Sequence, residues 1–155
     1  MTETTTIANG ALTDPWLQTR PGELCAIRVD SAETNGTYSV VEIVASPGDS
    51  TPIHVHARED EHFVILEGTA RIAYGEKTFD APTGTSISLM RGISHAWGNP
   101  SPDSKLRMLV TCTPGGAEEA LRLIAKGGDI DLMAIAKKSG VEILGPPLLG
   151  IPPAQ

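Results

Sequence analysis

The rhythm of the sequence over residues 24–113 most constrains how this chain can fold. Short apolar or alternating runs are interrupted there by turn-forming residues every 8 to 12 positions. That spacing is typical of an all-β sandwich or barrel. Alternation is clearest in Lys105–Cys112, where Leu106, Met108 and Val110 fall on one face. Apolar rows of this kind can line the interior of a closed sheet.

The turn residues divide this region into nine expected strands. The Asn35-Gly36 pair predicts a tight hairpin turn, because both residues tolerate a positive φ. The expected strands are Leu24–Asp30, Thr37–Ala45, Thr51–His56, Glu61–Leu66, Thr69–Tyr74, Lys77–Ala81, Thr85–Leu89, Ile93–Gly98 and Lys105–Cys112.

The flanking segments differ from this central region in composition and period. Residues 1–23 are polar and threonine-rich at the start, and we expect an N-terminal arm. After residue 113 the period becomes helical, which predicts helices at Ala117–Lys126 and at 129–138, the second capped by Asp129. The proline-rich remainder, Val141–Gln155, cannot be helical. The chain is therefore expected to hold one β-domain, residues 24–113, with a C-terminal extension, residues 114–155, that acts as a lid or a dimer contact.

Composition excludes several classes of protein. The 155 residues include 12 Lys+Arg and 19 Asp+Glu, a net charge of −7, which argues against a nucleic-acid binder or an anionic-membrane binder. No run approaches the roughly 20 apolar residues of a membrane helix, and the first residues lack the pattern of a secretory signal. Cys25 and Cys112 form no CxxC motif, so we expect two buried free thiols and a cytoplasmic location.

The four histidines carry the strongest chemical signal. His54 and His56 lie two residues apart and project to one face of an expected strand, and a hairpin can bring Glu61 beside them. With His95 they form a mixed nitrogen and oxygen donor set, which suits one divalent Fe, Mn, Ni, Co or Zn ion. Strand alternation turns the fourth histidine, His62, to the opposite side, at the surface or in an interface.

Other interpretations of these residues remain open. The three histidines are also compatible with ordinary strand histidines that are hydrogen-bonded near a core. Glu61 is also compatible with a solvated turn carboxylate, which is how we interpret its neighbours Glu59 and Asp60. Arg91, in the turn before His95, is expected at the surface rather than in a substrate site.

Two blocks of the sequence resemble the motifs of the cupin family. The first has fixed spacings between Gly48, His54, His56, Glu61 and Gly68. The second runs from Gly84 through Met90, Arg91, Gly92 and His95 to Asn99, and departs from the family only at Met90, where proline is usual. A spacer of 15 residues separates the blocks, as in small microbial cupins. The departure touches a turn and no expected ligand.

The resemblance implies a cupin double-stranded β-helix, a jelly-roll barrel, with two short C-terminal helices in this chain. It implies metal ligation by His54, His56, Glu61 and His95, and a homodimer. The segment GVEILGPPL is also similar to the tails of small cupins described as quercetin-dioxygenase-like.

An apolar pocket beside the metal is the expected substrate site. Such a site favours a flat or greasy molecule with one or two chelating oxygens. The same residues are also compatible with a plain barrel core, and Trp97 suits either the metal's surroundings or the barrel mouth. The expected pocket residues are Phe63, Ile65, Ile72, Trp97, Met108 and Val110.

The expected activity is that of a metal-dependent dioxygenase. The substrate would be an enolisable or aromatic small molecule, such as a flavonol or diketone, with O₂ as the second reactant and Glu61 as the base that removes a proton. The alternatives are a non-oxidative lyase, isomerase or cyclase with the same metal, and a non-catalytic cupin that binds a metal or ligand. No nucleic acid or membrane partner is expected.

Overall fold

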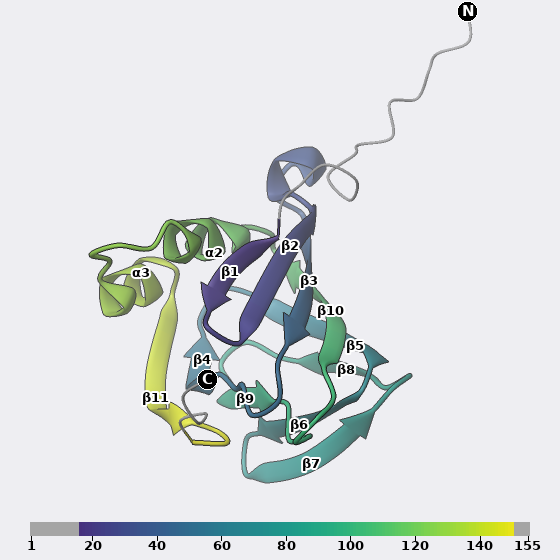
Figure 1. The fold of residues 1–155 in the computed structure, drawn as a ribbon. Coiled ribbons are helices and arrows are strands. Elements are labelled where there is room, and N and C mark those ends of the chain that lie inside the picture. The colour runs from purple at the N-terminus through teal and green to yellow at the C-terminus, as the bar shows by residue number, and fades with distance from the viewer. Residues whose placement is uncertain (1–15, 151–155) are drawn as a thin grey trace, which may run out of the picture.

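Two antiparallel β-sheets pack face to face and enclose the core (Figure 1). The structure, a computed structural model, describes residues 16–150. The first sheet contains, in spatial order, β1 (Leu17–Arg20), β2 (Glu23–Val29), β3 (Ser39–Ala45), β10 (Leu106–Thr113), β5 (Asp60–Glu67) and β8 (Ser86–Leu89). The second contains β11 (Val141–Pro147), β4 (Pro52–His56), β9 (His95–Gly98), β6 (Thr69–Tyr74) and β7 (Lys77–Pro82). The predicted all-β jelly roll is confirmed.

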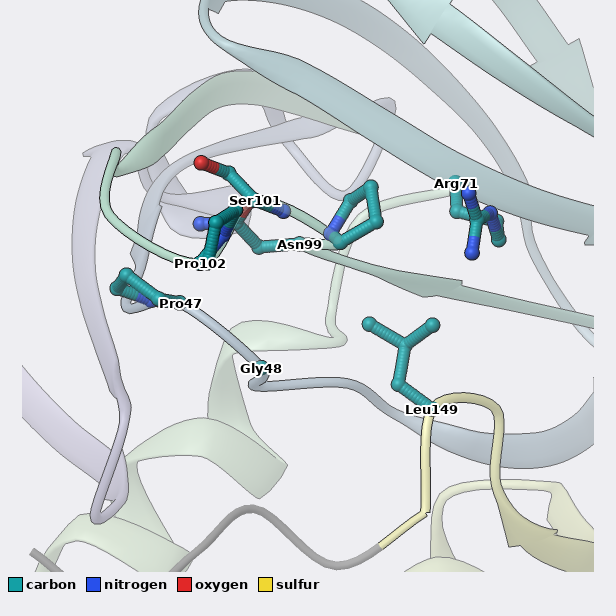
Figure 2. Close-up of a pocket in the computed structure, with 8 residues that line it drawn as sticks. Pro47, Gly48, Arg71, Asn99, Ser101, Pro102 and Leu149 are labelled. Carbon is teal, nitrogen blue, oxygen red and sulfur yellow. The ribbon is translucent and has the colours of Figure 1, made fainter.

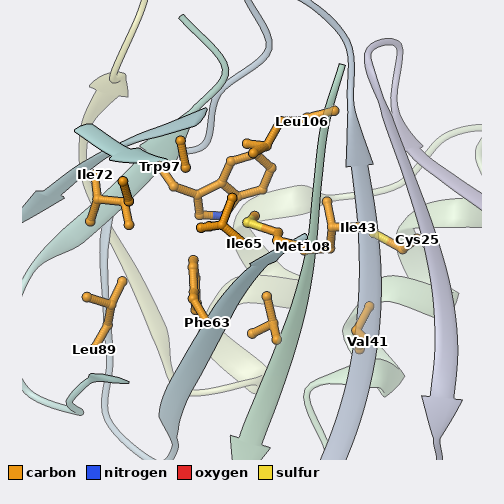
Figure 3. Close-up of a cluster of buried hydrophobic side chains, with 14 of the residues drawn as sticks. Cys25, Val41, Ile43, Phe63, Ile65, Ile72, Leu89, Trp97, Leu106 and Met108 are labelled. Atoms are coloured by element: carbon orange, nitrogen blue, oxygen red, sulfur yellow. The ribbon is translucent and has the colours of Figure 1, made fainter. Parts of the chain in front are cut away.

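The core lies between the sheets, and the alternation of side chains builds it. In β10, Leu106 and Met108 point inward, and Phe63 and Ile65 do the same from β5 (Figure 3). Val110, two residues after Met108 in β10, is buried as well. All five are at most 4% exposed. Burial of each such side chain contributes about 1.5–3 kcal/mol to folding. The sequence pattern predicted this interior row correctly.

Two predictions near the N-terminus need correction. The arm was expected to reach residue 23, but Leu17–Arg20 forms β1 and pairs antiparallel with β2; residues 1–15 lie outside the described residues. The Asn35-Gly36 pair does not make a two-residue hairpin. A short 3-10 helix, η1 (Ser31–Thr34), precedes it, and Asn35 caps that helix with a φ of 54°. The left-handed backbone was predicted, but the capping of η1 by Asp30 lengthened the connection.

The C-terminal extension consists of two helices and a strand. The helices are α2 (Glu118–Ala125) and α3 (Leu132–Lys138). The cap of α3 is Asp131 and not Asp129, because the Asp131 side chain accepts a hydrogen bond from the backbone N–H of Ala134 at 3.0 Å. Helix α2 packs against β1 (Figure 1).

The sequence did not predict strand β11. It pairs antiparallel with β4, and Val141 lies opposite His56 while Ile143 lies opposite His54. Pro146 and Pro147 lack N–H donors, but β11 lies at the edge of its sheet, where a missing N–H donor is tolerated. The extension therefore pairs with the edge of β4, the strand that carries two of the candidate metal ligands.

Both cysteines belong to the buried core. Cys25 and Cys112 are buried free thiols, as predicted, and burial raises the pKa of both thiols. No helix within residues 16–150 is both long and apolar enough to cross a membrane.

Two glycines with nearly the same backbone allow a matched stability test. Gly68 and Gly36 have φ of +79° and +78°, but an added Cβ at Gly68 would lie 2.6 Å from the backbone oxygen of Lys105, whereas Gly36 has open space. We expect Gly36→Ala to lower the free energy of unfolding by about 1–2 kcal/mol from strain. Gly68→Ala should cost about 1–3 kcal/mol more from overlap. Urea denaturation measures both, and equal losses would contradict this explanation.

Candidate metal centre

Three histidines converge between the sheets, close to one end of strand β9. His54 and His56 share the inward face of β4, and His95 on β9 lies directly opposite His54. One possible ligand atom from each ring lies within 4.8 Å of the others. The exposed fractions are 9%, 7% and 2% for His54, His56 and His95. The strand alternation that predicted a shared face for His54 and His56 is confirmed.

The Nδ1 atoms of the three rings are directed at oxygen acceptors. His54 Nδ1 is 2.7 Å from the Pro52 carbonyl oxygen, and His56 Nδ1 is 2.7 Å from Glu59 Oε1. His95 Nδ1 makes a longer contact, 3.4 Å, with the Ile93 carbonyl oxygen. Because these oxygens can only accept, each Nδ1 carries the hydrogen. In a neutral ring this leaves the lone pair on Nε2, the form that a metal ligand needs.

Glu61 completes the cluster from the opposite sheet. It belongs to β5, and its two carboxylate oxygens lie 3.2 Å from His56 Nε2 and 3.2 Å from His95 Nε2. Burial by itself raises the pKa of Glu61, but its contacts with His95 and His56, whose rings carry a positive charge only when protonated, lower its pKa overall. Glu61 is therefore ionised at neutral pH. The carboxylate lies where sequence analysis predicted it, and its role as a metal ligand stays a prediction.

The donor set fits a divalent transition metal ion. Burial lowers the pKa of His54 to about 4, so its ring is neutral at neutral pH. His56 Nε2 is buried and, among the described residues, has no hydrogen bond, although Glu61 lies at ion-pair distance. Burial disfavours the charged form of His56, but Glu59 and Glu61 raise its pKa overall, so a proton and a metal ion would compete for this ring. A buried nitrogen without a partner is costly unless a ligand satisfies it.

Residues of the two motifs that are not ligands connect the strands around the cluster. Gly92, with a φ of +77°, donates its N–H to the His56 carbonyl oxygen at 2.8 Å and so fixes the turn before His95. At the other end, the N–H of Gly48 donates to the carbonyl oxygen of Asn99 at 2.9 Å. The buried Asn99 side chain donates to the Ala45 carbonyl oxygen at 3.0 Å. Hydrogen bonds between the two motifs therefore hold the strands around the cluster in place.

Residues next to the second motif lie at the surface. Met90, where the motif usually has proline, is 44% exposed, and its N–H donates to the Tyr74 hydroxyl at 3.3 Å. Arg91 is exposed and pairs with Asp60, with Nε 3.0 Å from Oδ1. The structure thus places Arg91 at the surface, as predicted, and the departure at Met90 leaves His95 in position.

His62 points away from the cluster, as strand alternation predicts. Its Nδ1 lies 2.7 Å from Ser88 Oγ and its Nε2 lies 2.7 Å from Ser86 Oγ, both on the neighbouring strand β8. Both ring nitrogens therefore have partners outside the metal cluster.

His62→Ala is expected to leave metal content unchanged. The substitution removes a ring whose nitrogens are hydrogen-bonded to Ser86 and Ser88 at the surface, so it should cost at most about 1 kcal/mol of stability. Elemental analysis of the purified variant measures the metal, with the wild-type chain prepared in parallel as the reference. Loss of metal would show that the face assignment of β5 is wrong.

The six expected pocket residues all belong to the buried core cluster. They are Phe63, Ile65, Ile72, Trp97, Met108 and Val110, and Figure 3 labels all of them except Val110. Trp97 is 4% exposed, and the Arg20 guanidinium lies 5.5 Å from the centre of its ring. Their role in substrate binding stays a prediction. Figure 2 shows an open hollow elsewhere, lined by residues that include Pro47, Asn99 and Leu149; Asn99 follows the end of β9 opposite to His95.

Glu59 is buried, contrary to the sequence-based expectation. It was interpreted as a solvated turn carboxylate, but it is 7% exposed and accepts a hydrogen bond from His56 Nδ1. Its spacing of three residues from His56 is the signal that could have indicated this contact. The chain turns back after β4 and brings the Glu59 carboxylate next to His56 Nδ1. The adjacent Asp60 does lie toward the surface, with Arg91.

Sequence relatives match the central part of the chain. Residues 41–112 match the family model described as Cupin domain. Mannose-1-phosphate guanylyltransferase 2 of Escherichia coli O157:H7 is 30% identical over 73 residues, which cover 47% of this chain and 15% of that protein. RfbM, the corresponding enzyme of Salmonella typhimurium, is 29% identical over 97 residues, 62% of this chain and 20% of that protein. The chain thus spans a small part of the length of the curated relatives it matches.

Solved structures share the fold. KdgF from Halomonas sp. has a TM-score of 0.60 at 15% identity and covers 68% of this chain and 92% of its own. The polyketide cyclase RemF from Streptomyces resistomycificus has a TM-score of 0.58 at 20% identity, and the match covers 65% of this chain and 74% of RemF. A cupin-like protein from Thermotoga maritima has a TM-score of 0.56 at 16% identity, and the match covers 79% of this chain and 76% of that protein. Residues 41–112 thus match the cupin domain, and the solved structures share the two-sheet fold of this chain.

Proposed function

We propose that the protein is a metal-dependent enzyme that acts on an enolisable small molecule, with dioxygenation as its reaction. The observation that supports this most is the position of Glu61. A carboxylate with a lowered pKa lies 3.2 Å from two of three converging imidazoles. An ionised carboxylate beside a cation site is well placed to take a proton from a substrate bound there.

The protein residues have separate tasks in this proposal. His54, His56 and His95 hold the ion, which when bound would act as a Lewis acid and orient the chelating oxygens of a substrate. Glu61 takes the proton of the substrate hydroxyl or of the carbon next to its carbonyl, which leaves an electron-rich enolate. In dioxygenation both atoms of O₂ then enter the substrate, and Glu61 returns its proton to the product.

The apolar surroundings of Glu61 favour an aromatic or diketone substrate. Its direct neighbours across the sheet are Leu89 on β8 and Cys112 on β10, which are 0% and 3% exposed. Phe63, two residues on, is 1% exposed. A sugar-like substrate would require more hydrogen-bonding groups than these side chains offer.

A non-oxidative reaction is the second candidate, and the likeness to RemF favours it. That protein is a polyketide cyclase, and cyclisation can begin with the same removal of a proton by a carboxylate. In this case the enolate carbon attacks a carbonyl group within the same molecule, and no O₂ is consumed.

Oxygen uptake and product analysis distinguish the candidates. The chain would be reconstituted in turn with Fe, Mn, Ni and Co and mixed with a panel of flavonols and diketones. Oxygen consumption that depends on both metal and substrate is the expected result. Substrate conversion without O₂ would favour the lyase, isomerase or cyclase alternative. Tight binding of these compounds with no turnover would contradict an enzyme and indicate a non-catalytic binding protein.

A further inference from the structure

We propose that Glu59 is a positioning residue that holds the ring of His56 in the orientation and tautomer required for metal binding. The inference rests on the metal-binding site proposed above. It assigns a task to a buried carboxylate that takes no part in the proton transfer.

The position of Glu59 indicates this role. It lies in the short turn between β4 and β5, yet it is only 7% exposed. Its Oε1 lies 2.7 Å from His56 Nδ1. The donor atom of His56 toward the cluster is Nε2, on the other side of the ring, where Glu61 lies. Glu59 therefore lies behind His56 as seen from the metal site and is not itself directed at the ion.

The contact fixes which nitrogen of His56 carries the hydrogen. A carboxylate oxygen accepts but cannot donate, so Nδ1 must keep its hydrogen, and the lone pair of the neutral ring stays on Nε2. A carboxylate behind a metal-ligating histidine also fixes the ring orientation and raises the basicity of the donor nitrogen. Without Glu59 the ring could rotate or change tautomer, and either change would misplace the donor atom.

His56 differs from the other two ligands in this respect. The Nδ1 atoms of His54 and His95 face backbone carbonyl oxygens, those of Pro52 and Ile93, which a substitution does not remove. His56 alone of the three uses a side chain. Its orientation can therefore be tested by mutation without changing a ligand.

Metal affinity of the full chain tests the role of Glu59. Zinc(II) dissociation constants would be measured by competition with a chromophoric chelator for the wild type, Glu59→Ala, Glu59→Gln and Glu76→Gln. Glu76 is an exposed acid in the turn between β6 and β7, so its variant controls for the loss of one charge. We expect zinc affinity to fall about 10–100-fold in Glu59→Ala and about tenfold in Glu59→Gln, whose amide oxygen can still accept. Glu76→Gln should match the wild type.

A second measurement reports on the hydrogen itself. In zinc-loaded protein with ¹⁵N-labelled histidine, His56 Nδ1–H should give a protected, slowly exchanging proton signal. The signal should persist in Glu76→Gln and disappear in Glu59→Ala. A residue that only stabilised the fold would change the unfolding temperature in EDTA without this selective loss.

The possible outcomes separate the two proposals. Equal zinc affinity of wild type and Glu59→Ala, with the proton signal retained, would overturn the role of Glu59 and leave the metal site intact. If the alanine variant does not fold, the nearly isosteric Glu59→Gln decides, and an affinity within twofold of the wild type would overturn the inference. Absence of zinc binding by the wild type would overturn the proposed function and this inference with it.

Discussion

Replacement of His54 by alanine is expected to remove the metal and the activity together. His54 supplies one of three imidazole donors that lie within 4.8 Å of one another, and the remaining two rings with Glu61 cannot enclose an ion equally well. Metal content should fall from about one ion per chain to below about a tenth, and turnover should fall about 10³-fold or more, the scale expected when a group essential to the transition state is lost. Elemental analysis and a substrate assay measure the two quantities on the same preparation.

The fold of this variant needs its own check. His54 is only 9% exposed, so its loss leaves a small void, and unfolding of wild type and variant should be compared in EDTA, where neither carries metal. His62→Ala provides the matched control, since it removes a histidine that follows Glu61 on β5 but points away from the metal cluster. A His54→Ala protein that folds and keeps a full complement of metal would contradict the ligand assignment.

Glu61→Gln is expected to separate metal binding from turnover. The substitution keeps the size of the side chain but removes the charge and the basic oxygen. Metal should be retained with lower affinity, because the three histidines remain, while kcat should fall about 10²–10⁴-fold, the usual contribution of a general base. Steady-state kinetics with saturating metal give kcat, and a chelator competition gives the affinity.

Comparison of the loss of metal affinity with the loss of kcat shows which role Glu61 has. If saturating metal restores full activity to Glu61→Gln, the carboxylate serves only as a ligand, and proton transfer must be assigned elsewhere. A kcat that stays low at full metal occupancy is the result expected for a base.

Local periodicity predicted the parts of the molecule that are regular. The alternation in Lys105–Cys112 gave the inward row of β10, and the two-residue spacing of His54 and His56 gave their shared face. The same rule placed His62 opposite, where it meets Ser86 and Ser88. These features depend only on the geometry of a single extended strand.

Features that depend on a distant partner were not predictable in this way. Strand β11 forms by pairing with β4, whereas the prolines of this segment indicated only that it is not helical. β1 likewise exists through its pairing with β2. Glu59 looked like any exposed turn carboxylate because only the path of the turn brings it to His56 Nδ1. In each case tertiary contacts, and not local preference, decided the outcome.

Anomalous diffraction from crystals grown with cobalt(II) tests the central claim most directly. We predict one anomalous peak per chain, between β4, β5 and β9, about 2.0–2.1 Å from the Nε2 atoms of His54, His56 and His95, the usual distance for histidine nitrogens that bind zinc(II). Cobalt bound only elsewhere on the chain, or rings directed away from the ion, would contradict the account.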